Sequence, residues 1–360
     1  MKKSNKLLAL ILVTIMLFSL SACSNGGKSD GDKTRIALLL SGNLGDMSFL
    51  DSAKKGTDEI LAKYDNVEVR VVEMGSDSTK YETNVLDFSD DGYDIIIGSG
   101  WQLQEPFQNV AEKYPDITYI LFDASVDYEK SEYKNVYSIN YKVNEASYLA
   151  GILAAGLSKT GVIGFLGGQD GPGINDFLVG YIEGAKSLNE NIKVIVGYIG
   201  SFSDSPRAKE MALAQYNQGA DIIFTAAGAS GIGTLEAAAS QGKYAIGVDS
   251  DQALLFEESN PAISNSIPAS TLKNIDKTLV RAYDLYVNKK LPVGQAETLG
   301  LEDDAVSLTD NKYYEKLVPD DLKEKIKSAE QDIIAGKIKV STAYGMSNED
   351  LHSLIESVRP

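Results

Sequence analysis

The fold is decided by the stretch "RIALLLSGNLGDMSFLDSAKKG", residues 35–56. It begins with a short apolar run, 35–40, which is typical of a buried strand. A polar loop, 41–46, follows, and after it the apolar residues recur at helical spacing. A strand whose two faces are both apolar belongs to a parallel sheet that helices cover on both sides. This strand–loop–helix unit is therefore the element to look for along the rest of the chain.

The unit recurs along the chain and then starts again near its middle. Apolar or alternating runs predict strands at 67–73, 93–100 and 117–125, and, after a new start at 135–141, at 161–168, 192–200, 220–228 and 244–252. About 325 residues beyond position 33 are also more than a single core comfortably holds. We therefore predict an α/β fold of two doubly wound parallel-sheet lobes joined by a hinge.

The N-terminus predicts export and anchoring. Three lysines precede the uncharged stretch 7–20, which is too short to cross a bilayer core of ~30 Å but fits the apolar part of a signal peptide. The order Leu-Ser-Ala-Cys at 20–23 resembles a bacterial lipobox, in which Cys23 receives a diacylglyceryl group, and two acyl chains make a stable anchor. We expect a signal peptide at 1–22, a lipidated tether at 23–33 and a location on the outer face of the cell membrane. An accidental cysteine in an ordinary signal peptide is the alternative.

Charge and composition exclude several classes of function. The chain carries a net charge of −17, which repels nucleic-acid phosphates, so we expect no polynucleotide partner. Cys23 is the only cysteine and His352 the only histidine, so no metal site built on thiolate or imidazole is expected. The loop "GGQDGPG", 167–173, lacks a phosphate-binding order of glycines and is interpreted as a tight turn. We predict no catalytic residues and no cofactor, and we expect a monomer.

Candidate ligand contacts lie where the predicted strands end. Ligands of such sheets bind beyond the carboxyl ends of the strands. Carboxylates there can accept paired hydrogen bonds from a diol, and aromatic rings can stack on a flat base or a sugar. An acid that follows a strand can equally cap the next helix, which is an even alternative for Asp46 and Asp204. Trp101 can equally cover the core. The candidates are Asp46, Phe49, Trp101, Asp123, Phe202, Gly228 and Asp249.

Five motifs together resemble a known family. They are "GDMSFLDSAKKG" (45–56), "NVYSINYKVNEASYLAGILAA" (135–155), "AGASGIGTLEAA" (227–238), "YAIGVDSDQ" (244–252) and the tail "LGLEDDAVSLTDN" (299–311) with "AGKIKV" (335–340). They are similar to the basic membrane proteins, bacterial lipoproteins that resemble periplasmic binding proteins and feed nucleoside ABC transporters. The resemblance runs from about 34 to 340.

The resemblance carries expectations for fold and mechanism. It implies a type I periplasmic-binding-protein fold, divided into 34–141 plus 268–300 and 142–267 plus 301–360. The lobes would close on a small-molecule ligand and present it to ABC permease subunits. It also implies that acids grip the ribose or base edges (Asp46, Asp123, Asp249), that Phe49 and Phe202 stack on the base, and that Gly228 lines the pocket.

One stretch departs from the family pattern. The family commonly has Thr-Ser-x-x-Lys after the last core strand, with the lysine on the ligand. Here "SNSIPASTLKN" (264–274) aligns Ser266 with the serine and Ala269 with the lysine, and whether Lys273 reaches from one helical turn further on is left open. Leu50 stands where asparagine is common. The preferred nucleoside is therefore open, as are a sugar or other small polar ligand, a receptor role, and a secreted nucleoside hydrolase.

Overall fold

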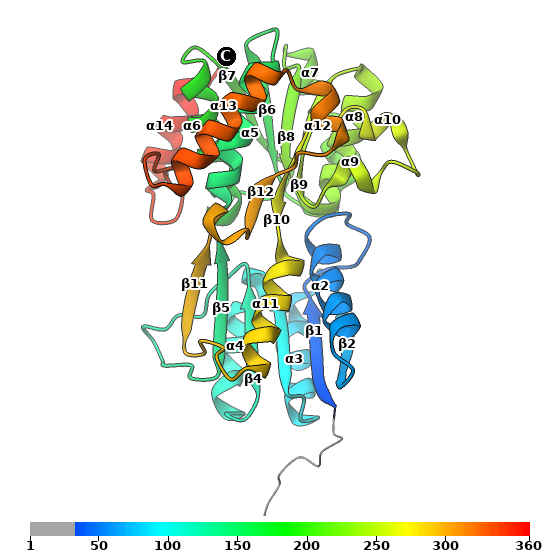
Figure 1. Ribbon diagram of the computed structural model, residues 1–360, viewed down its shortest axis with the longest axis vertical. Coiled ribbons are helices and arrows are strands. Elements are labelled where there is room, and N and C mark those ends of the chain that lie inside the picture. The colour runs from blue at the N-terminus through cyan, green and yellow to red at the C-terminus, as the bar shows by residue number, and fades with distance from the viewer. Residues whose placement is uncertain (1–32) are drawn as a thin grey trace, which may run out of the picture.

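The computed structural model describes residues 33–360, which form two lobes stacked along the long axis and joined at a narrow waist (Figure 1). The predicted signal peptide and all of the tether before residue 33, with Cys23, lie outside the described residues. No helix of residues 33–360 is long and apolar enough to span a membrane. Each lobe contains one six-stranded sheet with helices on both faces, so the predicted α/β architecture of two parallel-sheet lobes is confirmed.

The N-terminal lobe is built on the sheet β11-β5-β4-β3-β1-β2, in which every pair of neighbours is parallel. Five consecutive residues of its strand at 34–40 are fully buried, as expected for a central strand covered on both faces. Its elements are β1 (Thr34–Leu40), α2 (Phe49–Lys63), β2 (Val67–Glu73), α3 (Tyr81–Asp90), β3 (Ile95–Ser99), α4 (Gln104–Val110), β4 (Thr118–Phe122), β5 (Val136–Tyr141), α11 (Ile275–Val287) and β11 (Gln295–Leu299).

The C-terminal lobe repeats the plan with the order β12-β10-β9-β8-β6-β7, and only its edge strand β12 is antiparallel. Its elements are α5 (Val143–Leu157), β6 (Val162–Gly167), α6 (Pro172–Leu188), β7 (Lys193–Tyr198), α7 (Ser205–Asn217), β8 (Ile222–Ala226), α8 (Gly231–Gln241), β9 (Tyr244–Asp249), α9 (Gln252–Leu255), α10 (Pro261–Ser264), β10 (Ser270–Lys273), β12 (Val306–Leu308), α12 (Lys312–Leu317), α13 (Asp320–Ile334) and α14 (Asn348–Val358).

Two helices of this lobe pack unusually close together. In α5, eleven of fifteen residues are buried, and α6 lies along it. A Cβ atom added at Gly184 of α6 would lie 1.9 Å from the carbonyl oxygen of Tyr148 in α5. Glycine is therefore required at this crossing, because any side chain would push the two backbones apart.

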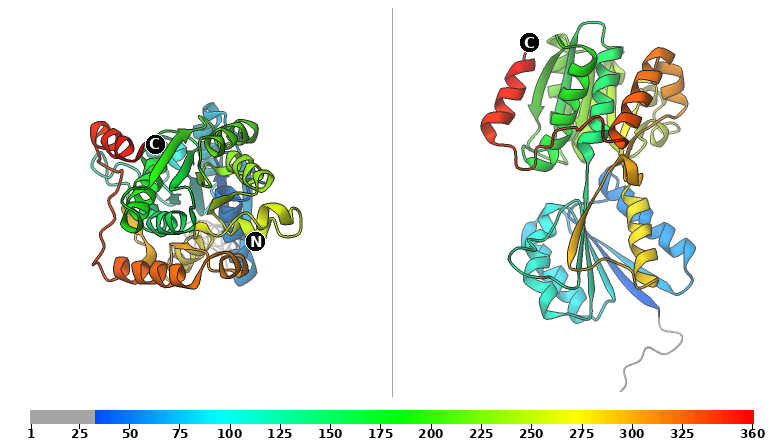
Figure 2. Two further views of the ribbon diagram at one scale, coloured as in Figure 1. Left: turned by 90° about the horizontal axis from the view of Figure 1, so that it is seen from above. Right: turned by 60° about the vertical axis from the view of Figure 1, so that its left-hand side comes forward.

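The chain crosses between the lobes three times, as Figure 2 shows at the waist: from β5 into α5, from β10 into α11, and from β11 into β12. We expected the second crossing at residue 268, but β10 pairs with β9 and with β12, so 270–273 belong to the C-terminal sheet and the crossing comes at Asn274. The reason is strand pairing, which buries three of the four residues of "STLK" before the chain leaves the C-terminal lobe.

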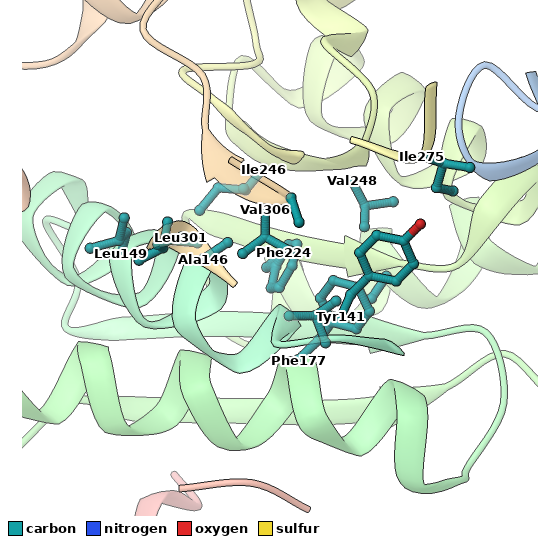
Figure 3. Close-up of a cluster of buried hydrophobic side chains, with 14 of the residues drawn as sticks. Tyr141, Ala146, Leu149, Phe177, Phe224, Ile246, Val248, Ile275, Leu301 and Val306 are labelled. Atoms are coloured by element: carbon teal, nitrogen blue, oxygen red, sulfur yellow. The ribbon is translucent and has the colours of Figure 1, made fainter. Parts of the chain in front are cut away.

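An apolar cluster runs through the waist and joins the cores of both lobes. It extends from strands of the N-terminal lobe through crossing residues such as Tyr141 and Ile275 to Phe224 and Ile246 of the C-terminal sheet (Figure 3). The crossings are thus packed segments and not free linkers. They carry side chains into the space where the carboxyl ends of the two sheets face one another.

Candidate functional site

Two carboxylates meet at this junction from opposite lobes, each held in a rare backbone conformation. Asp123 directly follows β4 and has φ 61°, and Asp249 ends β9 with φ 63°. The left-handed region is unfavourable for residues with a side chain, and such strain is found preferentially at functional sites. The two lobes therefore present equivalent, strained acids at equivalent strand ends.

Lys273 lies between these acids. Its Nζ atom donates to Asp123 Oδ1 at 2.7 Å and lies 3.9 Å from Asp249 Oδ1, although its side chain is only 5% exposed. Three aromatic rings surround the ammonium group at 5.2 to 5.7 Å from their centroids, a distance at which a cation is attracted to a ring face. These rings belong to Phe49, Tyr141 and Phe177.

The charges of this cluster support one another. Burial alone would lower the pKa of Lys273, but the Asp123 and Asp249 carboxylates outweigh it and raise the pKa, so the ammonium group stays charged. Burial raises the pKa of Asp249, against the opposing effects of Lys273 and of the hydroxyl of Ser48. A buried acid is thus kept near a buried cation in a part of the molecule where screening by water is weak.

Asp249 has an unused hydrogen-bonding atom. Its Oδ2 accepts a hydrogen bond from Ser48 Oγ at 2.7 Å, whereas its Oδ1 is buried and has no hydrogen-bond partner. A buried acceptor without a donor costs free energy, so an unpaired one needs an explanation. A ligand hydroxyl that donates to this oxygen would supply one. We call Ser48, Asp123, Asp249 and Lys273 the junction cluster.

The loop before α2 docks on the C-terminal lobe and places Ser48. Gln252 Nε2 donates to the carbonyl of Met47 at 3.2 Å, and Ser250 Oγ donates to the carbonyl of Ser48 at 3.2 Å. Asp46 orders this loop from within, because its two oxygens accept three backbone N–H groups at 2.8 to 3.1 Å. Burial raises the pKa of Asp46 to about 6 in spite of these donors. These contacts with N–H groups at the start of α2 agree with the helix-capping alternative for Asp46. A contact between Asp46 and a ligand stays a prediction.

The predicted aromatic residues lie on both lobes. Phe49 begins α2 and is half-buried, with its ring centroid 5.4 Å from that of Phe122. Phe202 is half-buried in the loop after β7, and a Cβ atom added at Gly168 would lie 2.3 Å from its ring. Gly228 has φ 53° and lies against Phe202 as well. The loops after β6, β7 and β8 therefore come together around one ring.

Other predicted residues stand apart from the junction cluster. Trp101 begins a short 3-10 helix after β3 and is 61% exposed, so it does not cover the core. Asp204 caps α7 by accepting the N–H of Arg207 at 3.1 Å. Leu50 is buried in the first turn of α2.

The strand β10 shows how Lys273 reaches the junction, which the sequence left open. The sequence suggests a helical turn between Ala269 and Lys273, but the segment is extended, and the strand carries the lysine from the buried Ala269 to the junction. Sequence reasoning did not single out Ser48, Tyr141 or Phe177. Ser48 lies inside the motif "GDMSF", which was the available signal, whereas nothing in the pattern marks Tyr141 and Phe177 as neighbours of a lysine.

Two surface hollows, of about 370 and 330 Å³, lie away from the junction: one beside Tyr128 and Gly294, the other between α5 and α13. Within residues 33–360, no group of three or more His, Cys, Asp or Glu side chains is placed to hold a metal ion. The candidate site therefore rests on the facing side chains of the junction.

Comparison with known proteins agrees with this architecture. Residues 33–342 match the Bmp family model, described as ABC transporter substrate-binding protein PnrA-like. The chain is 32% identical over 329 residues to basic membrane protein D of Borreliella burgdorferi, covering 91% of this chain and 93% of that protein. It is 31% identical to the ABC transporter nucleoside-binding protein BmpA of Lactococcus lactis, covering 92% and 96%.

A solved structure supports the same conclusion. A solute-binding protein of an ABC transporter system from Aeropyrum pernix superimposes with a TM-score of 0.78 at 26% identity, covering 90% of this chain and 97% of that one. The periplasmic-binding-protein fold and the resemblance to basic membrane proteins are thereby confirmed. The family binds solutes and does not transform them, so the hydrolase alternative is ruled out. The chain belongs to the PnrA-like family of ABC transporter substrate-binding proteins.

Proposed function

We propose that the protein binds a nucleoside at the junction between its lobes and delivers it to the permease of an ABC transporter. The observation that carries the proposal is the buried Oδ1 of Asp249, an acceptor without a donor, held beside Lys273 and Asp123. A ribose diol offers the donors that such acids accept. The name of the Lactococcus relative, a nucleoside-binding protein, is consistent with this ligand class.

Each part of the junction has a role in the proposal. The diol donates to Asp249 and Asp123, and Lys273, with two further N–H donors besides the one given to Asp123, donates to the ligand. Phe49 from one lobe and Phe202 from the other face the flat base, which stacks on aromatic rings. Gly228 leaves room beside Phe202, and Trp101 lies at the rim of the N-terminal lobe.

Binding stabilises the closed arrangement of the lobes because the ligand contacts both. The loop of Ser48 already touches the C-terminal lobe, and residues of the crossings pack in the apolar cluster of the waist. A ligand shifts such an equilibrium only by its differential affinity for the closed form. The closed protein then presents the surface that the permease recognises.

A sugar is the second candidate, because the same acids and rings suit a pyranose. Isothermal titration calorimetry of the full-length chain with guanosine, inosine, adenosine and ribose separates the two. We expect heat with at least one nucleoside and a Kd raised by about 10-fold or more in Asp249→Asn, since a hydrogen bond to a charged group is lost. Asp204→Asn is the matched control: it changes a strand-end acid that caps a helix. Binding of ribose alone would overturn the nucleoside proposal.

We further propose that the protein is held on the outer face of the cell membrane by lipidated Cys23. The support is the order Leu-Ser-Ala-Cys behind a short apolar stretch, together with the family's role in membrane transport. A ligand-sensing role beside a signalling partner would use the same site and is tested by the partners that co-purify.

A further inference from the structure

The segment after α13 runs past the end of the family match, which stops at residue 342. It runs along the outer edge of the C-terminal lobe from α13 and then enters α14 (Figure 2). We call residues 338–347 the strap. Nothing in its sequence pattern marked it as part of the site.

The strap is fastened by buried polar residues. Asp176 of α6 is 1% exposed, and its Oδ1 accepts from Thr342 Oγ1 at 2.6 Å and from the N–H of Ala343 at 2.8 Å. Asn144 of α5, which is also buried, donates to the carbonyl of Ser341 at 3.0 Å. Such bonds to buried polar groups hold the segment in one position. The residues just after Ala343 therefore have a defined place beside α6.

A tight turn at the end of the fastened part presents one aromatic ring. The N–H of Met346 donates to the carbonyl of Ala343 at 3.1 Å, and Gly345 has φ 81°. This is the pattern of a type II turn, which needs glycine at its third position and displays the residue at its second. That residue is Tyr344, which is 55% exposed, one of the most exposed large apolar side chains of the described residues.

Tyr344 lies against the start of α6, next to the loop after β6 that also contacts Phe202. Its hydroxyl is 3.3 Å from the place of a Cβ atom on Gly173, at the start of α6. Burial of the hydroxyl, followed by the negative charges of Asp123 and Asp176, raises its pKa. The residue as a whole is exposed, whereas its hydroxyl end is sheltered against the start of α6. The ring therefore lies near the carboxyl end of β6, as the ring of Phe202 does, and part of its surface is exposed.

We propose that Tyr344 is a third aromatic contact of the ligand site and stacks on the flat heterocyclic base of the bound nucleoside; this role rests on the proposed function. An exposed ring costs solvation free energy until something covers it, and a planar base is the ligand part that covers a ring face. The strap supplies this ring from the lobe opposite Phe49. Of the two lobes, the C-terminal one thus contributes two rings, Phe202 and Tyr344.

The test compares variants of the full-length chain by calorimetry with the nucleoside that the wild type binds. Tyr344→Ala is expected to raise Kd by roughly 5- to 100-fold, the range for losing one base-stacking ring. Tyr344→Phe keeps the ring and is expected to stay within about 2-fold, whereas ribose without a base would respond to neither change. A thermal melt of each variant shows that the fold is kept.

A second pair of variants tests the turn without removing the ring. Gly345→Ala and Gly336→Ala both place a side chain at a left-handed glycine with open space around it, φ 81° and 70°. The two substitutions should strain the backbone by similar amounts, because both glycines have a left-handed conformation. Only Gly345 lies in the turn that orients Tyr344, so only Gly345→Ala is expected to weaken nucleoside binding. Equal affinities for wild type and Tyr344→Ala would overturn the inference while leaving the nucleoside site intact. A wild type that binds no nucleoside would overturn the proposed function and this inference together.

Discussion

Lys273 offers the sharpest test of the junction. In Lys273→Met the side chain stays unbranched and apolar along its length but loses its charged terminal nitrogen, so Asp249 stays buried beside no cation. At an effective dielectric constant of about 20, a unit charge 3.9 Å away contributes about 4 kcal/mol. Removing one partner of a buried pair typically costs about 3–5 kcal/mol. We therefore expect a loss of about 3–4 kcal/mol in the free energy of unfolding.

The chain contains a matched control for this change. Lys277 Nζ lies 2.7 Å from Asp304 Oδ2, the same distance as in the Lys273–Asp123 pair, but both side chains are more than half exposed. Exposed pairs contribute about 0.2–1 kcal/mol, so Lys277→Met should change little. The two ion pairs thus have the same distance between their charged atoms and differ in how deeply their side chains are buried.

The assay is thermal unfolding followed by circular dichroism at neutral pH. At about 2 °C for each kcal/mol, Lys273→Met should melt roughly 6–8 °C below the wild type and Lys277→Met within about 2 °C of it. Adding Asp249→Asn to Lys273→Met should recover part of the loss, because a neutral amide needs no cation nearby. Equal melting temperatures for the two lysine variants, or a further fall in the double variant, would refute the electrostatic account of the junction.

Other parts of the molecule give three further predictions. Burial raises the pKa of Asp46 from 3.8 to about 6, so the folded protein binds a proton before the unfolded chain does and gains stability as the pH falls from about 6 toward 4. Between pH 7 and pH 5 this gain amounts to about 1 kcal/mol, and urea unfolding at the two pH values should show that it is missing in Asp46→Asn. Gly184→Ala should lower stability by about 1–3 kcal/mol in a thermal melt, because its Cβ would lie 1.9 Å from the Tyr148 carbonyl. Cys23→Ala should move the protein from the membrane fraction to the medium on immunoblots, and continued sedimentation with membranes would contradict lipidation at that residue.

Strands β1 to β9 and the two lobes were predictable because their signal is local, whereas the short strand β10 and the edge strands β11 and β12 were not predicted. Runs such as "RIALLL" and "YDIIIGSG" became the buried strands β1 and β3 almost residue for residue. Burial on both faces of a parallel strand leaves a continuous apolar run, and its short length, flanking turn residues and β-branched content distinguish it from a buried helix.

The site was predictable only where an acid or a ring follows a strand. Asp123 and Asp249 were found in this way, but their left-handed backbone has no counterpart in the sequence. Lys273 belongs to a four-residue strand whose length gives no periodicity, so its place at the junction depended on pairing with β9 and β12. Tyr344 depended on tertiary contacts of the strap with α5 and α6. Such contacts join residues far apart in sequence and leave no local pattern.

The three crossings also govern when the protein is able to fold. The N-terminal sheet receives its edge strand β11 from residues 295–299, about 150 positions after its neighbour β5, and α11 is interposed from 275 onward. A ribosome must therefore have made more than four-fifths of the chain before either lobe is complete, and until then β5 has an open edge. Cutting the coding sequence at the first crossing, near residue 142, would therefore leave an N-terminal fragment without its edge strand β11, whereas the C-terminal fragment would carry β11 and α11 in addition to its own six strands.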